Sequence, residues 1–339
     1  MVEAMKRSRA IKRSHWLAAA LATLGALIGW GAFWYTAAAP QEEVVSRPPV
    51  SILFAGDIML DRDSARAAQA RGPQYLFGSS SELFEQSPLR VANLEGTITG
   101  NPSIAQRDSS ILRFTFEPSL AREVIEGLNL SAVSLANNHS LDFGAQGFNL
   151  TRDYLSQWGV ASFGSPYNAS STNSTILTSG GISVCLVGYM ELFDPDEHSA
   201  INAIESLRPS CSRIIVFAHW GVEYSHAATT LQVREAHDFI DAGADAVVGA
   251  HPHVVEPVEV YRGKPIVYSL GNFIFDQNFS WDVEHGALLK VDLYPDHLRL
   301  TLIPTTIEDE HSSLAQGADY ERVLSLMGLP EGIDTLSLP

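Results

Sequence analysis

Short apolar runs rich in β-branched residues recur along the chain, and five of them stop on a side chain that can bind a metal or carry a proton. The strands of one sheet bring their ends to a common edge, so five such ends can supply a single site. We therefore expect the chain to be organised around this convergence. The five runs with their polar ends are residues 54–57, 91–95, 134–139, 214–219 and 246–253.

Helical and extended segments alternate through most of the chain, and hairpins follow near its end. This pattern predicts an α/β fold with mixed sheets. Apolar residues at helical spacing predict helices over residues 63–70, 118–127, 144–158, 230–242 and 319–327. Apolar runs predict strands over residues 50–55, 88–95, 130–135, 174–177, 182–187, 213–218, 246–250, 266–270, 287–294 and 297–303.

Two polar segments lie outside this pattern. Residues 100–110 contain Gly, Pro and Asn and are expected to form a loop over the strand ends, either a lid or substrate loop or an ordinary surface loop. Residues 306–339 are a mostly polar C-terminal extension. No internal repeat or second domain boundary is evident, so we expect residues 50–305 to form one domain.

The N-terminal segment differs in character from the rest. Residues 1–15 carry five basic side chains, and residues 16–39 contain no charge. As a helix, the uncharged stretch would be about 36 Å long and could cross a hydrocarbon core of about 30 Å. The basic residues should stay in the cytoplasm, which predicts a single-pass transmembrane anchor in the cell membrane, a linker over residues 40–49 and an extracytoplasmic domain. A cleaved signal peptide is the alternative, because residues 37–39 are small.

The chain has a formal net charge of −17, and the negative charge lies beyond the N-terminal segment. Five of the 22 basic residues fall within residues 1–40, which leaves 17 in the body against 38 acidic residues. Such a body is a poor candidate for nonspecific nucleic-acid binding, which needs basic surface. It also offers an anionic substrate no long-range attraction unless bound cations or a local basic patch offset the field.

The chain has two cysteines, Cys185 and Cys211, so a disulfide scaffold is excluded. One bridge between them would be allowed outside the cytoplasm. Cys185 lies inside a continuous apolar run, which favours a plain buried thiol as the interpretation.

The polar strand ends offer a mixed set of oxygen and nitrogen donors. Such a set suits Mn, Fe or Zn, and there are enough donors for two divalent ions about 3.5–4 Å apart. The ordinary interpretation is that Asn and Asp favour turns after strands and that the histidines are loop residues without a metal. The set comprises Asp57, Asn93, Glu95, Asn138, His139, His219, His251 and His253.

Six motifs, in order along the chain, resemble the capsule-synthesis CapA family. That family is associated with poly-γ-glutamate synthesis or export and belongs to the calcineurin-like metallophosphoesterase superfamily. The resemblance covers residues 50–305 and implies a four-layer α/β/β/α sandwich with the site at the strand ends. The motifs are GDIML at 56–60 with Arg62, NLEG at 93–96, ANNHSLD at 136–142, HWGVEY at 219–224, GAHPH at 249–253 and SLGNFIFD at 269–276.

The resemblance also implies a role for each matching position. His139 would be the proton donor that acts on the leaving oxygen. We assign Arg62 and Asn93 to substrate contact, and an ordinary surface arginine is the alternative for Arg62. The implied metal ligands are Asp57 and His253 for the first ion, Glu95 as the bridge, and Asn138, His219 and His251 for the second ion.

Two positions depart from the pattern of the superfamily but are shared with the CapA pattern. Met59 stands where the superfamily usually has a histidine. A thioether is a poor ligand for a hard ion, so the first metal loses an imidazole. The segment Asn93-Leu94-Glu95 replaces the usual Gly-Asp-x-x-Asp motif.

Three functions are compatible with these observations. The first is a membrane-anchored metal-dependent hydrolase that acts on a phosphate ester or on the linkage of an anionic polymer. The second is a non-enzymatic scaffold that the anchor holds to the ligase and membrane subunits of a polymer synthesis and export complex. The third is a metal-dependent phosphodiesterase unrelated to poly-γ-glutamate. Metal content and phosphodiester hydrolysis separate the first from the second.

Overall fold

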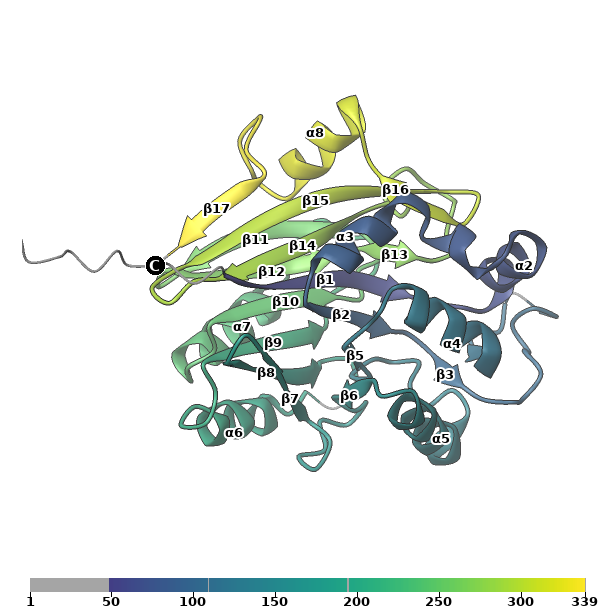
Figure 1. Ribbon diagram of the computed structural model, residues 1–339, viewed down its shortest axis with the longest axis horizontal. Coiled ribbons are helices and arrows are strands. Elements are labelled where there is room, and N and C mark those ends of the chain that lie inside the picture. Colours follow the sequence, from purple (N-terminus) through teal and green to yellow (C-terminus); the bar gives the residue numbers. More distant parts are fainter. Residues whose placement is uncertain (1–48, 109, 194, 339) are drawn as a thin grey trace, which may run out of the picture. The chain divides into compact units, whose positions relative to one another are not determined.

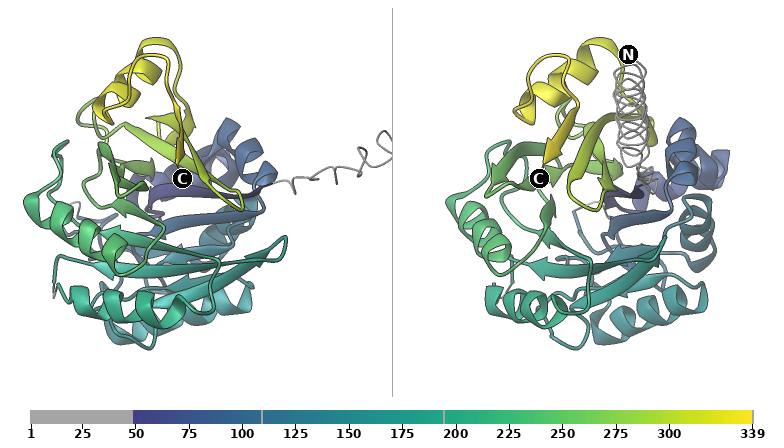
Figure 2. Two further views of the ribbon diagram at one scale, coloured as in Figure 1. Left: turned by 90° about the vertical axis from the view of Figure 1, so that its left-hand side faces the viewer. Right: turned by 60° about the vertical axis from the view of Figure 1, so that its left-hand side comes forward.

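Two β-sheets stand face to face in this computed structural model, which describes residues 49–108, 110–193 and 195–338 (Figure 1 and Figure 2). In the first sheet the strand order is β16 (His311–Leu314), β15 (Leu298–Glu308), β14 (His285–Leu293), β1 (Val50–Ile58), β2 (Leu89–Leu94), β5 (Ala132–Ser134) and β6 (Ala161–Phe163), with β13 (Asn272–Ile274) beside β1 and β17 (Thr335–Leu338) beside β15. In the second sheet the order is β11 (Val255–Tyr261), β12 (Lys264–Leu270), β10 (Ala246–Ala250), β9 (Arg213–His219), β8 (Ile182–Met190) and β7 (Ser174–Ser179). A small ribbon is formed by β3 (Thr97–Ile98) and β4 (Thr115–Phe116).

An apolar layer joins the two sheets. Successive side chains of β1 point to opposite faces, so Phe54 enters this layer while Leu53 and Ala55 face the helices outside the first sheet. The Phe54 ring meets Phe217 of β9 edge-on, with 5.9 Å between the ring centroids. Because both faces of the central strands are buried, these strands are continuous apolar runs rather than alternating ones.

Helices cover the outer face of each sheet. The predicted mixed α/β fold is therefore confirmed, and its layers follow the order helix, sheet, sheet, helix. The first sheet is covered by α2 (Arg62–Arg71), α3 (Ser81–Gln86), α4 (Pro118–Gly127), α5 (Gly144–Gln157) and the 3-10 turns η1 (Pro73–Leu76) and η2 (Gly78–Ser80). The second sheet is covered by α6 (Glu197–Leu207) and α7 (Thr230–Asp241), and α8 (Gly317–Leu326) packs against β11, β14 and β15.

The parallel strands of both sheets end at one shared edge. β1, β2 and β5 are parallel neighbours in the first sheet, and β8, β9 and β10 are parallel neighbours in the second. The arrowheads of β1, β2, β8 and β9 point the same way in Figure 1. The register pairs Asp57 with Asn93 and His219 with Ala250, so polar residues from distant segments meet at this edge.

Cys185 and Cys211 form a disulfide, so the expectation of a plain buried thiol at Cys185 was wrong. Cys185 lies in β8 and pairs in register with Ile214 of β9, and Cys211 lies two residues before that strand begins. The crossover through α6 thus brings the two Cα atoms to 5.9 Å, a usual separation for a bridge.

Residues 306–339 continue the first sheet. β15 runs to Glu308, beyond its expected end at residue 303, and both β16 and β17 pair with β15. The apolar residues of α8 join the core between the sheets.

The expected transmembrane anchor at residues 16–39 lies outside the described residues. Among the residues that the structure does describe, no helix combines the length and the apolar character needed to span a bilayer.

Candidate functional site

The six expected metal ligands lie at the shared strand edge, on five different turns or strand ends. A chain of short contacts links them, and all except Asn138 are buried. Asp57 lies in β1, Glu95 follows β2, Asn138 follows β5, His219 ends β9, and His251 and His253 follow β10.

A buried amide network lies beneath this cluster. Asn93 Nδ2 donates to Asp57 Oδ1 at 2.7 Å, and Asn93 Oδ1 accepts from Asn137 Nδ2 at 3.0 Å. Asn93 is only 1% exposed and does not line the cavity beside the cluster. The geometry gives Asn93 a contact that orients Asp57, while the substrate contact expected from the sequence stays a prediction.

His219 and Asn138 are spaced to share a ligand. His219 Nε2 lies 2.8 Å from Asn138 Oδ1. Two neighbouring donors on a six-coordinate ion at about 2.1 Å lie roughly 3 Å apart, so the same arrangement suits such a cation as well as a hydrogen bond. Burial and the neighbouring His251 lower the pKa of His219 well below its ordinary value, which keeps the ring neutral and able to ligate.

The His-Pro-His segment adopts an unusual backbone that turns both imidazoles inward. His251 and His253 have φ angles of 99° and 59°, a region that residues other than glycine rarely adopt. Their ring centroids are 5.9 Å apart, although alternate residues of a regular strand would point to opposite sides. His253 Nδ1 lies 3.3 Å from Asp57 Oδ2, and the same carboxylate oxygen accepts from the backbone N–H of His251. Strain of this kind is typical of functional sites.

Burial and local charge drive the pKa values of the cluster apart. Burial, with the nearby Asp57, raises the pKa of Glu95 well above its ordinary range. Burial and the His253 charge lower the pKa of His251 to about 3. Burial alone would lower the pKa of His253, but Glu95 and Asp57 outweigh it and raise the value to about 9. The cluster therefore combines a buried carboxyl group, that of Glu95, with two imidazoles, those of His219 and His251, that keep a free lone pair.

The donor set fits a divalent ion. Both carboxylate oxygens of Glu95 and the Nδ1 atom of His251 are buried without a hydrogen-bond partner among the described residues. A buried polar group without a partner is costly, and a cation would satisfy these atoms together. Oxygen and imidazole donors of this kind suit Mn, Fe or Zn.

The candidate ligands fall into two groups of three. Within each group the ligand atoms lie within 4.8 Å of one another. This grouping differs from the assignment implied by the family resemblance, which places Asp57 with His253 and gives Glu223 no role. The two groups are Asp57, Glu95 and His219, and Glu223, His251 and His253.

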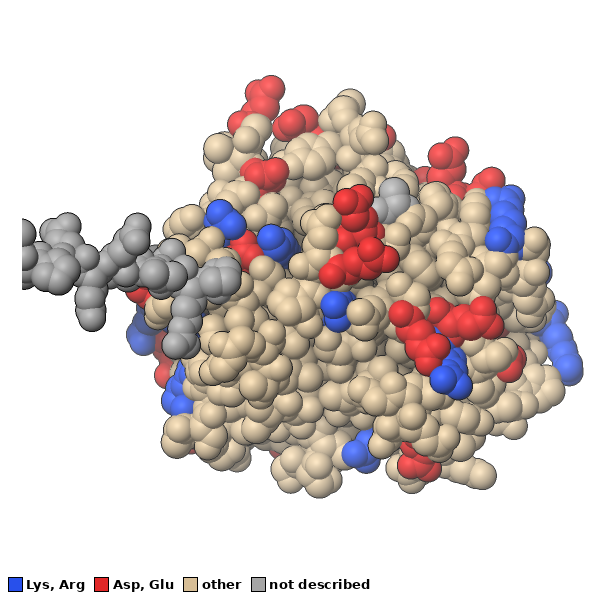
Figure 3. Space-filling model, in the orientation of Figure 1, with Lys and Arg blue, Asp and Glu red and all other residues tan. Residues whose placement is uncertain are grey.

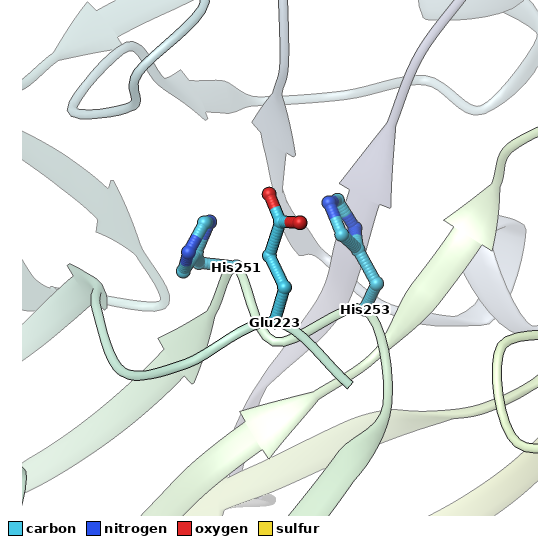
Figure 4. Close-up of side chains that lie close together, drawn as sticks. All are labelled: Glu223, His251 and His253. Carbon is cyan, nitrogen blue, oxygen red and sulfur yellow. The ribbon is translucent and has the colours of Figure 1, made fainter. Parts of the chain in front are cut away.

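Glu223 is a site residue that the sequence reasoning did not assign. It lies in the exposed loop after β9, and Figure 4 shows its carboxylate between the imidazoles of His251 and His253. The available signal was its position four residues after His219 within the HWGVEY motif.

Met59 takes no part in the site. It is completely buried, and its sulfur accepts the backbone N–H of Asp61 at 3.1 Å. Met59, at the position where the superfamily usually has a histidine, therefore stabilises the turn after β1.

His139 lies at the boundary between the cluster and a cavity. Its Nδ1 is 2.8 Å from Asp142 Oδ2, which fixes the ring and directs Nε2 toward Glu95 Oε1 at 3.9 Å. The ring also packs on Phe114, with 4.3 Å between centroids. This arrangement leaves Nε2 free to exchange a proton with a group in the cavity.

Arg62 lies in the wall of the same cavity. Its guanidinium pairs with Asp276 and lies 4.9 Å from the centroid of the Phe114 ring, while its Nε is buried without a partner among the described residues. Arg62 is therefore placed at the cavity and is not an ordinary surface arginine.

The cavity has a volume of about 480 Å³ and opens directly onto His139, Glu223 and His253. Its mouth includes three exposed apolar side chains, Leu112, Tyr224 and Phe279. Residues 105–107 of the polar loop also line it, which agrees with the interpretation of residues 100–110 as a loop over the strand ends.

Sequence comparisons with known proteins identify the family of this chain. The family described as "Bacterial capsule synthesis protein PGA_cap" matches residues 51–277. The PGA biosynthesis protein CapA of Bacillus subtilis is 30% identical over 257 residues, which cover 71% of this chain and 67% of that protein. The capsule biosynthesis protein CapA of Bacillus anthracis is 25% identical over 282 residues, which cover 77% of this chain and 68% of that protein. A solved structure, the NAD nucleotidase of Haemophilus influenzae, is 14% identical and has a TM-score of 0.45, covering 82% of this chain and 62% of that one.

Proposed function

Because the chain belongs to the PGA_cap family of bacterial capsule synthesis proteins, we propose that it is a membrane-anchored hydrolase of poly-γ-glutamate synthesis or export, with a calcineurin-like divalent metal centre. The observation that carries the hydrolase proposal is the buried Glu95 carboxylate, which has no hydrogen-bond donor among the described residues and faces the imidazoles of His139 and His253. Its burial is unfavourable unless a cation completes the site.

The chain supplies the ligands from several strand ends. Bound divalent ions would polarise the scissile group and lower the pKa of a water molecule. The protein holds these ligands in place through a second set of contacts, in which Asn93 orients Asp57 and Asn272 Oδ1 lies 3.0 Å from His253 Nδ1. The proposed ligands are Asp57, Glu95, Asn138, His219, His251 and His253.

His139 is the proposed proton donor. Asp142 fixes its Nδ1, so the proton that reaches the leaving oxygen comes from Nε2 at the cavity face. Because His139 is not among the ligands, its removal should lower turnover without releasing metal.

Arg62 is the proposed contact for an anionic group of the substrate. It is held by Asp276 and by the Phe114 ring, and a pre-positioned guanidinium suits phosphate and carboxylate oxygens. The substrate is accordingly a phosphate ester or a linkage in the anionic polymer.

An extracytoplasmic site agrees with the disulfide. Bridges form and persist in oxidising compartments, and Cys185 and Cys211 are joined. With the anchor proposed for residues 16–39, the domain would work at the outer face of the cell membrane beside the ligase and membrane subunits of the synthesis complex.

The test is metal analysis of the purified full chain together with a phosphodiester assay before and after chelation. We expect bound Mn, Fe or Zn, and hydrolysis of bis(p-nitrophenyl) phosphate that chelation abolishes and metal restores. Asn138→Ala and His251→Ala should lose both metal and activity. A full chain that binds no divalent metal, or hydrolyses equally well after chelation, would contradict the proposal.

The same protein could act as a scaffold, and the two roles give different results in cells. A scaffold would still support polymer synthesis after His139→Ala but not after deletion of residues 1–39. A hydrolase requires both features, so polymer made normally by the His139→Ala strain would exclude catalysis as the essential role.

A further inference from the structure

We propose that Glu223 is the third protein ligand of an outer cation position formed with His251 and His253, beside a deeper position formed by Asp57, Glu95 and His219. The inference rests on the metal centre proposed above. It adds one ligand to that centre and divides the ligands between two cation positions. The outer position would take a divalent ion of the Zn, Mn or Fe type.

The first support is geometric. Figure 4 shows the Glu223 carboxylate between the two imidazoles, and the three ligand atoms lie within 4.8 Å of one another. Ligand atoms of a tetrahedral ion at about 2.1 Å lie roughly 3.4 Å apart, so small side-chain rotations close the set. Two imidazoles with one carboxylate form a set that catalytic metal sites use while keeping a position open.

The second support is an unpartnered atom in the same place. His251 Nδ1 is buried without a hydrogen-bond partner among the described residues, and His251 as a whole is 4% exposed. A neutral imidazole nitrogen in this state can bind a metal ion, because no hydrogen-bond donor occupies its lone pair. Among the carboxylates, that of Glu223 belongs to the same group of candidate ligand atoms as His251.

The backbone of the Glu223 loop is fastened to the His-Pro-His segment. The Trp220 N–H donates to the Ala250 carbonyl at 3.2 Å, and the Tyr224 N–H donates to the Pro252 carbonyl at 2.8 Å. Between these two bonds, Gly221 has a φ of 86° and donates its N–H to the Glu191 carboxylate. The loop that carries Glu223 is therefore fixed beside the turn that carries both histidines, although Glu223 itself is exposed.

Glu223 gives the outer position a third protein donor beside the two imidazoles. Since Glu223 also lines the cavity, the open coordination position of the outer ion would face the substrate.

Glu223→Gln tests this role because it keeps the side-chain length and removes the anionic oxygen. The metal-stripped full chain is titrated calorimetrically with Zn²⁺, and Co²⁺ binding is followed by its visible absorption. We expect two equivalents for the wild type, and for Glu223→Gln one equivalent with unchanged affinity and a second weakened by about 100-fold or more. Glu205→Gln, on the exposed face of α6, is the matched control and should bind like the wild type.

His219→Ala addresses the deeper position and should lose the other equivalent while keeping the one that depends on Glu223. Circular dichroism of each variant verifies the fold. Two unweakened equivalents in Glu223→Gln would overturn the inference and leave the proposed function standing. A wild-type chain that binds neither ion would instead overturn the metal centre itself.

Discussion

Glu256 is a buried carboxyl group near the loop that carries Glu223. Its ionisation should make the free energy of unfolding depend on pH. Its Oε2 accepts from Gln232 Nε2 at 2.8 Å, while its Oε1 has no hydrogen-bond partner among the described residues. Gln232 packs against Gly221, where an added Cβ would lie 2.7 Å from Gln232 Nε2. The ionisation of Glu256 can therefore act through Gln232 on the loop that carries Glu223.

The size of the effect follows from the pKa of this carboxyl. Burial, and to a lesser degree the charge of Glu191, raises the pKa of Glu256 from 4.5 to about 7. Because the folded-state value is the higher one, the stabilising contribution is complete below pH 4.5 and is lost as the pH rises through about 7. The full difference corresponds to roughly 3 kcal/mol, of which about 2.5 kcal/mol falls between pH 5 and pH 8. Glu256→Gln has no such ionisation, so its stability relative to the wild type should rise by that amount over this interval.

Urea unfolding followed by tryptophan fluorescence at pH 5 and pH 8 measures this change. The new amide group has a stability cost of its own, but that cost is the same at both pH values and cancels in the difference. Glu205→Gln serves as the exposed control and should show no pH-dependent difference. If the stability of Glu256→Gln relative to the wild type is equal at pH 5 and pH 8, the pKa of Glu256 is not raised and the reasoning fails.

Three further predictions test other parts of the structure. Replacing Cys185 and Cys211 by serine should lower the free energy of unfolding by about 3–4 kcal/mol, since the bridge closes a loop with a sequence separation of 26; unfolding with and without reductant measures it. His139→Ala should lower phosphodiester turnover by about 10²–10⁴-fold with unchanged metal content, as shown by steady-state kinetics and metal analysis of the same sample. Gly221→Ala should destabilise the fold by about 1–3 kcal/mol and weaken metal binding, because its φ of 86° and its contact with Gln232 exclude a Cβ; thermal unfolding and calorimetric titration measure both.

Helices and strands with an uninterrupted pattern of apolar residues were predictable from the sequence, and those with an interrupted pattern were not. β10 and α4 lie where the apolar pattern placed them, because buried strands and capped amphipathic helices leave a clear local signal. β11 escaped prediction since Pro257 and two glutamates interrupt its apolar residues. α6 escaped because its buried face rests on Ala200 and Ile204 alone among mostly polar neighbours.

The candidate site was predictable as a set of strand ends but not as a network. Parallel strands must end together, so a polar residue at each end was sufficient to predict convergence. The inward direction of both His251 and His253 depends on left-handed backbone angles that no sequence periodicity reveals. The position of Glu223 depends on backbone bonds to Ala250 and Pro252, which lie in a different segment of the chain. The motifs therefore predict which residues meet, and tertiary contacts determine how their side chains are directed.

The charge balance of the cavity links metal binding to substrate binding. The visible face carries clusters of carboxylates with basic side chains scattered between them (Figure 3), so the body as a whole repels an anion. In the cavity wall, by contrast, the arginines and the carboxylates balance, with three of each. Two of the arginines are already paired, Arg62 with Asp276 and Arg66 with Asp63. Commitment of Glu223 to a cation would leave Arg107 and that cation as a local excess of positive charge. Under the proposed function, an anionic substrate should therefore enter a metal-loaded cavity more readily than a metal-free one, because a cation at the outer position would supply positive charge that the acidic body lacks.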